Sequence, residues 1–217
     1  MKTSRVTFSK GEESKRRVLD AALALFSEQG YEKTTMRQII AKSGVLNGSV
    51  YYAFKNKDGI YEYIFDLILD RVYGSIEKED MDALTLLLYP AAIKLHAVAN
   101  NGMLAEMIYH AHRSWRITTN MIIRYEDYLR DYCSLKDYTP DDECLHRFCL
   151  ALSGMLSAFA DEEYLDGKKV PLETNLRFIA EYVCSMLNLP RDNLDADVSS
   201  VAEKVRARKS VLEDLSF

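Results

Sequence analysis

The sequence predicts an all-α protein in which a three-helix domain of the helix-turn-helix type precedes a larger helical domain. Apolar residues recur at spacings of three and four along most of the chain, as on one face of a helix. Only 9 glycines and 4 prolines occur in 217 residues, so obligate breaks are few. No stretch rich in β-branched residues alternates apolar and polar residues as a half-buried strand would.

Three short helices are predicted in the first 57 residues. The first extends from about residue 14 to Gly30, because its apolar residues share one face and glycine readily ends a helix. A second is predicted over 36–42, with a threonine before it as a cap. Gly44 then permits a tight turn into a third helix over 48–53. This order is typical of a helix-turn-helix, and we assign 1–57 to that domain.

The remaining residues, 58–217, are expected to form the second domain. A long amphipathic helix begins at Lys57-Asp58. Further helices are predicted near 81–100, 103–116, 118–135, 141–165, 172–188 and 196–213, with breaks rich in Asn, Gly and Pro between most of them.

Charge is distributed unevenly between the two predicted domains. Residues 1–57 contain 11 Lys and Arg against 5 Asp and Glu, a net charge of +6. The other residues contain 17 basic and 28 acidic side chains, a net charge of −11. A basic first domain followed by an acidic second domain favours binding of a polyanion by the first domain alone. A chance cluster of charges on a solvated surface would give the same distribution.

Several classes of protein are not expected from this sequence. It has no apolar run of 18 residues and no signal-peptide pattern at its start, so we expect a cytoplasmic protein with no membrane partner. The four cysteines (Cys133, Cys144, Cys149, Cys184) form no CxxC pair and are expected to be reduced core residues, with a redox-sensing thiol as the alternative. We find no phosphate-binding glycine loop, HExxH motif or nucleophile elbow, and expect no cofactor, no metal and no catalytic residue.

The segment from Val18 to Phe65 resembles the DNA-binding domain of TetR-type regulators. The resemblance is carried by LFSEQGYEKTT, then MRQIIAKSGV, then NGSVYYAFKNKDGIYEYIF, in that order. Its anchors are Phe26, Gly30, Tyr31, Thr34, Thr35, Ile39, Ala41, Gly44, Val45, Gly48, Tyr51, Phe54 and Lys57. It implies a DNA-binding domain followed by a ligand-binding and dimerisation domain, and a homodimer on a pseudo-palindromic operator of double-stranded DNA.

Candidate DNA-binding residues follow from this resemblance and from their chemistry. Small polar side chains of the third helix can enter a major groove, and hydroxyls or basic groups around it can reach phosphates. The candidates are Arg16, Arg17, Thr35, Arg37, Asn47, Gly48, Ser49, Tyr51, Tyr52 and Lys57. Packing, capping or plain solvation are the alternative roles of Tyr51, Thr35 and Lys57. One departure from the family pattern is Leu46, which cannot cap the third helix, so Asn47 is a candidate cap instead.

The second domain offers candidates for a ligand pocket and a dimer interface. Polar and aromatic side chains among apolar ones suggest a pocket for a small-molecule effector at Tyr89, His96, Glu106, His110, Arg113, Tyr125 and Tyr128. Two late helices are expected to form the dimer interface through Leu145, Phe148, Leu152, Leu156, Phe159, Leu176, Ile179 and Val183, or to place these residues in the core. Glu106 and His110 share a face, which leaves a metal site, an ion-paired surface or a catalytic pair open.

These observations favour a ligand-responsive repressor that binds DNA as a dimer. One alternative is an activator, or a regulator controlled by a protein partner instead of a small molecule. A more remote alternative is a helical enzyme that uses Glu106 and His110.

Overall fold

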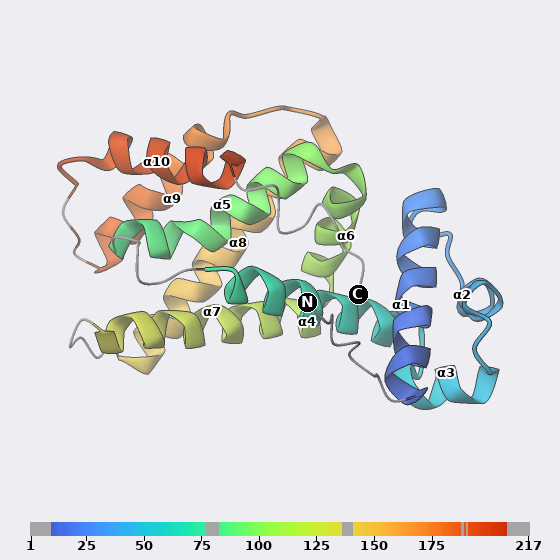
Figure 1. Cartoon of the computed structure of the whole chain (residues 1–217). Coiled ribbons are helices and arrows are strands. Elements are labelled where there is room, and N and C mark those ends of the chain that lie inside the picture. The colour runs from blue at the N-terminus through green and yellow to red at the C-terminus, as the bar shows by residue number, and fades with distance from the viewer. Residues whose placement is uncertain (1–9, 77–82, 136–140, 188, 190, 208–217) are drawn as a thin grey trace, which may run out of the picture. The chain divides into compact units, whose positions relative to one another are not determined.

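The computed structural model describes residues 10–76, 83–135, 141–187, 189 and 191–207 (Figure 1). Over these ranges the chain forms ten helices and no strand, which confirms the all-α prediction. The described residues divide into two compact units, with the boundary inside one helix, after Leu67. No described helix is long and apolar enough to cross a membrane.

The first unit contains three short helices and the start of a fourth. They are α1 (Lys10–Gln29), α2 (Met36–Ser43), α3 (Asn47–Phe54) and α4 (Lys57–Gly74). The first turns of α4 belong here because Ile60 and Ile64 are buried and the ring of Tyr61 packs edge-on against Phe26. The boundary therefore lies later than the 57/58 division expected from the sequence.

The second unit is built around a buried helix, α5. It contains the end of α4 and then α5 (Ala83–Asn100), α6 (Gly102–Arg113), α7 (Trp115–Leu135), α8 (Asp142–Asp166), α9 (Leu172–Leu187) and α10 (Leu194–Ala207). Every side chain from Leu84 to Ile93 is buried, because α6, α8, α9 and α10 all pack against α5 (Figure 1). Burying such a helix on all sides is what its almost continuous apolar sequence requires.

A proline within α5 explains two buried tyrosines of α7. Pro90 has no N–H, so the carbonyl of Leu86 lacks its helical donor. The hydroxyl of Tyr128 donates to that oxygen at 2.6 Å, and the hydroxyl of Tyr125 donates to the carbonyl of Leu87 at 2.7 Å. The side chains of α7 thus complete the backbone hydrogen bonding of α5.

The cysteines only partly follow expectation. Cys149 and Cys184 are buried and free, whereas Cys144 is free but exposed, so the prediction of a core position is wrong for Cys144. Burial raises the pKa of the Cys149 thiol to about 12, which keeps it protonated near neutral pH. The side chain of Cys133 lies outside the part of the chain that the structure describes.

Candidate DNA interface

The third helix, α3, presents a polar face that is held by two apolar side chains. Val50 and Phe54 are buried beneath it, and Val50 is only 1% exposed. Asn47, Gly48, Ser49, Tyr51 and Tyr52 are all exposed, and Tyr52 is 92% exposed. The eight-residue helix is therefore anchored along one side and open along the other, as a helix that enters a DNA groove must be.

The N-terminus of α3 has no side-chain cap. Leu46 occupies the N-cap position, and its carbonyl accepts from the N–H groups of Ser49 and Val50 at 2.9 and 3.2 Å. Asn47 is the first residue of the helix, so the expectation that Asn47 caps it is wrong. The first N–H groups of an uncapped helix end carry partial positive charge and suit a phosphate oxygen.

The turn before α3 depends on Gly44 and on an arginine of α1. Gly44 adopts a left-handed conformation (φ +62°) and its N–H donates to the carbonyl of Ile40 at 3.1 Å. The guanidinium of Arg17 donates to the carbonyl of Ser43 at 2.6 Å, and a Cβ at Gly44 would lie 2.8 Å from that guanidinium. Arg17 thus fixes the end of α2 to α1, and only its other N–H groups remain for the predicted phosphate contact.

The start of α2 is capped as the sequence suggests, by Thr35. Its hydroxyl accepts from the N–H of Gln38 at 3.3 Å, and the Gln38 side chain accepts from the N–H of Thr35 at 2.9 Å. This reciprocal pair is a capping box. Thr35 and Arg37 are both exposed, and so is Arg16 on α1, which lies 4.0 Å from Asp20.

Lys57 contacts protein atoms at the start of α4. Its ammonium donates to the carbonyl of Tyr31 at 2.8 Å and lies 3.9 Å from the centre of the Tyr31 ring. The hydroxyl of Tyr31 donates to Asp58. Lys57 therefore ties the loop after α1 to α4, a structural role that competes with the predicted phosphate contact.

Gly59 is a residue whose role the sequence does not reveal. A Cβ at this position would clash with the carbonyl oxygen of Phe54, at the end of α3. Its N–H donates to the side chain of Asn56 at 2.8 Å, which caps the start of α4. The close approach of α4 to α3 therefore needs a glycine here.

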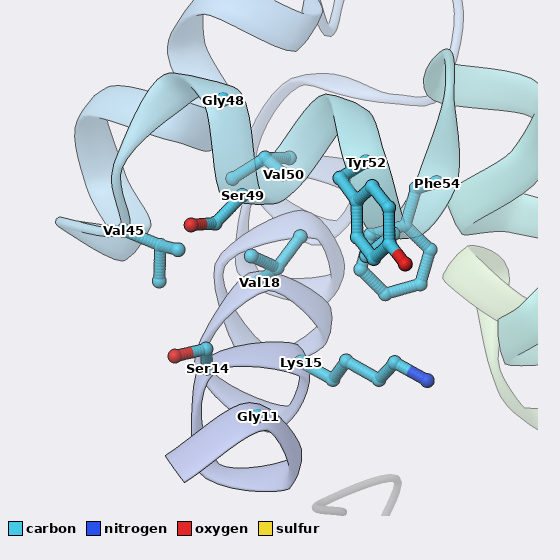
Figure 2. Close-up of a pocket in the computed structure, with 11 residues that line it drawn as sticks. Gly11, Ser14, Lys15, Val18, Val45, Gly48, Ser49, Val50, Tyr52 and Phe54 are labelled. Carbon is cyan, nitrogen blue, oxygen red and sulfur yellow. The ribbon is translucent and has the colours of Figure 1, made fainter.

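A groove of about 670 Å³ separates the N-terminal half of α1 from α3. Figure 2 shows Val18 facing Val50 between the two helices, with Lys15 and Tyr52 lying together to one side. Lys15 also lies 5.6 Å from the centre of the Tyr63 ring. The groove adds Lys15 to the exposed residues around α3, a residue that was not among the predicted contacts.

The predicted ligand residues of the second unit do not form one pocket. Tyr89 is buried in α5, and the hydroxyls of Tyr125 and Tyr128 are bound to the α5 backbone. These two tyrosines have a structural role in place of the predicted ligand contact. His96 lines a separate recess of about 350 Å³ that also includes Arg206.

Glu106, His110 and Arg113 lie near one another on α6. Nε2 of His110 is 3.9 Å from Oε1 of Glu106, which is longer than a hydrogen bond between these two atoms. Arg113 stacks 3.3 Å from the centre of the Tyr109 ring and lies 3.6 Å from a carboxylate oxygen of Asp161. Among the described residues no group of three His, Cys, Asp or Glu could hold a metal ion.

Six of the eight predicted interface residues are core residues instead. Each is at most 3% exposed within the single chain, so it has no surface to offer a partner: Leu145, Phe148, Leu152, Leu176, Ile179 and Val183. The correction has a physical reason, because a helix has two sides and periodicity alone does not say what covers each. Leu156 and Phe159 remain half-buried.

Comparison with known proteins identifies the first unit. Residues 18–64 match the model of the bacterial regulatory proteins of the tetR family, and this segment contains α2 and α3 in full. This segment is therefore a domain of the tetR-family type. The match bears out the resemblance read from the motif order.

Named transcriptional regulators match part of the chain. The chain is 34% identical over 76 residues to the regulator AcrR of Shigella flexneri, covering 35% of each protein. It is 39% identical over 57 residues to the repressor KstR2 of Rhodococcus jostii, covering 26% of this chain and 28% of the relative. The matches thus span about a third or less of these relatives' length.

Solved structures extend the likeness of fold to the second unit. TylP, a TetR regulator from Streptomyces fradiae, aligns with a TM-score of 0.59 at 17% identity. The alignment covers 93% of this chain and 94% of TylP. GusR from Salmonella enterica aligns with a TM-score of 0.55 at 21% identity, over 83% and 98% of the two chains. At these identities the likeness concerns the fold alone.

Proposed function

We propose that this chain is a transcriptional repressor that binds a pseudo-palindromic operator as a dimer and releases it when a small molecule binds the second unit. The observation that carries DNA binding is the exposed polar face of α3 above the buried Val50 and Phe54. The uncapped N-terminus of α3 and the basic residues of α1 and α2 add groups suited to phosphates. A named relative, KstR2, is a repressor, which supports the direction of regulation.

A dimer is supported by an apolar surface on α8 and α9. Phe178 and Met186 on α9 are exposed, and so is Leu165 near the end of α8. Two small exposed residues, Ala151 and Ala158, precede Leu165 on the same helix at steps of about two turns. Such a surface suits close packing of two copies of the chain. The first units of the two copies would then bind half-sites one or more turns of the DNA helix apart.

Ligand control acts through a shift between two populations of the dimer. A molecule that binds the second unit more tightly in one state favours that state, and it lowers operator affinity by the same factor by which the operator lowers its own affinity. Helix α4 begins in the first unit and ends in the second, which gives the two units a continuous connection.

The test is selection of DNA from a random pool by the full chain. We expect enrichment of an inverted repeat, and we expect Ser49→Glu to abolish it, because a carboxylate on α3 would face phosphates and base edges. The matched control is Ser199→Glu on an exposed face of α10, which should select the same DNA as the wild type. Enrichment of no sequence, or equal selection by Ser49→Glu, would refute the proposal.

A further inference from the structure

The buried helix α5 contains one Lys, Arg, Asp or Glu, and this residue is Lys94. Desolvation lowers the pKa of Lys94 to about 7, although the negative charge of Asp161 acts in the opposite direction. Yet its side chain keeps some accessible surface. Lys94 is therefore strongly desolvated although part of its surface stays accessible.

Neighbouring polar groups come from α6 and α8. The ammonium of Lys94 lies 2.6 Å from Nε2 of His112 on α6. Desolvation and the charges of Lys94 and Arg113 lower the pKa of His112 to about 2, so its ring is neutral. The other ring nitrogen of His112 and one carboxylate oxygen of Asp161 are buried without a hydrogen-bond partner. A buried ring N–H without a partner is costly, and the oxygen of a bound ligand would satisfy His112, whereas the Asp161 oxygen needs a donor from elsewhere on the ligand.

We propose that Lys94 binds the carboxylate of a small organic acid in a site between α5, α6 and α8, with His112 beside it. This inference rests on the proposed function, for which it names the class of effector. The local charges favour an anion, because the positive charges of Lys94 and Arg113 outnumber the single carboxylate of Asp161. If Nε2 of His112 accepts from Lys94, its Nδ1 carries the proton and offers a further donor to the acid.

The proposal implies a defined dependence on pH. Lys94 interacts with His112 from α6 and with the charge of Asp161 from α8, and Arg113 from α6 acts in turn on His112 and Asp161. On α9 and α10, which also pack against α5, Glu173 and Arg206 pair with each other at 2.5 Å. Only protonated Lys94 attracts the acid, so above pH 7 its apparent affinity should fall about tenfold for each pH unit. Below pH 7 the affinity should level off.

The experiment is calorimetric titration of the full chain, without DNA, with benzoate and octanoate and with their uncharged amides. At pH 6.5 we expect at least one acid to bind about tenfold or more tightly than its amide. Lys94→Met should weaken that acid at least tenfold. Lys94→Arg, which stays charged at all pH values used, should bind the acid and lose the weakening between pH 7 and pH 9.

Controls separate this site from general effects. Lys168→Met changes an exposed lysine that pairs with Glu162, and should bind the acid as the wild type does. Circular dichroism checks that each variant keeps its helices; should Lys94→Met unfold, the pH profile of Lys94→Arg decides. Acids and amides that bind equally, unchanged binding by Lys94→Met, or no acid that binds, would overturn the proposal. The titration contains no DNA, so its result does not depend on operator selection. A failure to select an operator would refute the proposed function without changing the result of the titration.

Discussion

Gly48 lies on the exposed face of α3, and the fold does not require a glycine at this position. Its backbone lies outside the left-handed region, and a Cβ there would meet no atom within 4 Å. Glycine inside a helix costs about 0.5–1 kcal/mol relative to alanine, so the free chain would be more stable without it. The DNA contact proposed for α3 would explain the glycine, because a DNA backbone or base edge could then approach the helix closely.

We therefore expect Gly48→Ala to separate stability from DNA binding. The free energy of unfolding should be unchanged or raised by up to about 1 kcal/mol. Affinity for the selected operator should fall about tenfold or more, because the added methyl group occupies the surface that meets DNA. Urea unfolding and fluorescence anisotropy with labelled operator measure the two effects.

Two other glycines supply the comparison. Gly102 begins α6 with open space around it, so Gly102→Ala should leave operator affinity unchanged. Gly59→Ala should instead destabilise the chain by about 1–3 kcal/mol, because its methyl group would clash with the carbonyl of Phe54. Equal operator affinity of Gly48→Ala and the wild type would argue against α3 as the reading helix.

At the scale of helices, Pro90 of α5 and Tyr128 of α7 form a matched pair. The missing N–H of the proline leaves the Leu86 carbonyl to the tyrosine hydroxyl. Tyr128→Phe should cost about 1–3 kcal/mol, the range for leaving a buried acceptor unsatisfied. The cost should be smaller by about 1 kcal/mol in a Pro90→Ala background, where the helix supplies the donor itself. Thermal unfolding of the four variants of this double-mutant cycle gives the coupling.

Tyr125 is the control for this coupling, because it donates to Leu87 of the same helix. The helical donor for Leu87 is the N–H of Ala91, which is present whether residue 90 is proline or alanine. The cost of Tyr125→Phe should therefore be the same in both backgrounds. If Tyr128→Phe also cost the same in both, the hydroxyl would not be replacing the donor that Pro90 removes.

At the scale of the whole molecule, the exposed apolar surface of α9 supports a second copy of the chain as its partner. Phe178, on this surface, is 59% exposed. We expect Phe178→Glu to convert the dimer to a monomer, because burying two unpaired carboxylates in an interface is costly. Affinity for the operator should fall in the monomer, because each half-site then binds one chain independently of the other. Sedimentation velocity measures the oligomeric state.

Trp115, which is 72% exposed at the start of α7, is the matched control. Trp115→Glu makes the same kind of change on a different helix, and should leave the dimer intact. A wild-type chain that sediments as a monomer at micromolar concentration, or a dimer that survives Phe178→Glu, would move the interface elsewhere.

The local features of the first unit could be predicted from the sequence itself. Thr35 as a cap, Gly44 as a turn and the polar face of α3 each depend on residues a few positions apart, which is the range over which helices begin and end. The described helix ends of the second unit also lie within a few residues of the prediction, with the break between α6 and α7 earlier, at Ser114, while the predicted end of the last helix at 213 lies outside the described residues. Periodicity carries this information because a helix repeats the same geometry along its length.

Only the tertiary structure decided what each helix face meets. Leu152 and Ile179 proved to be core because other helices of the same chain cover them, while Phe178 was left outside. Arg17 and Lys57 found partners 26 residues away, and Lys94 met His112 18 residues away, distances that no local pattern encodes. The sequence by itself determined where the described helices lie and which of them has an exposed polar face; the packing of those helices determined which polar groups are left without a partner.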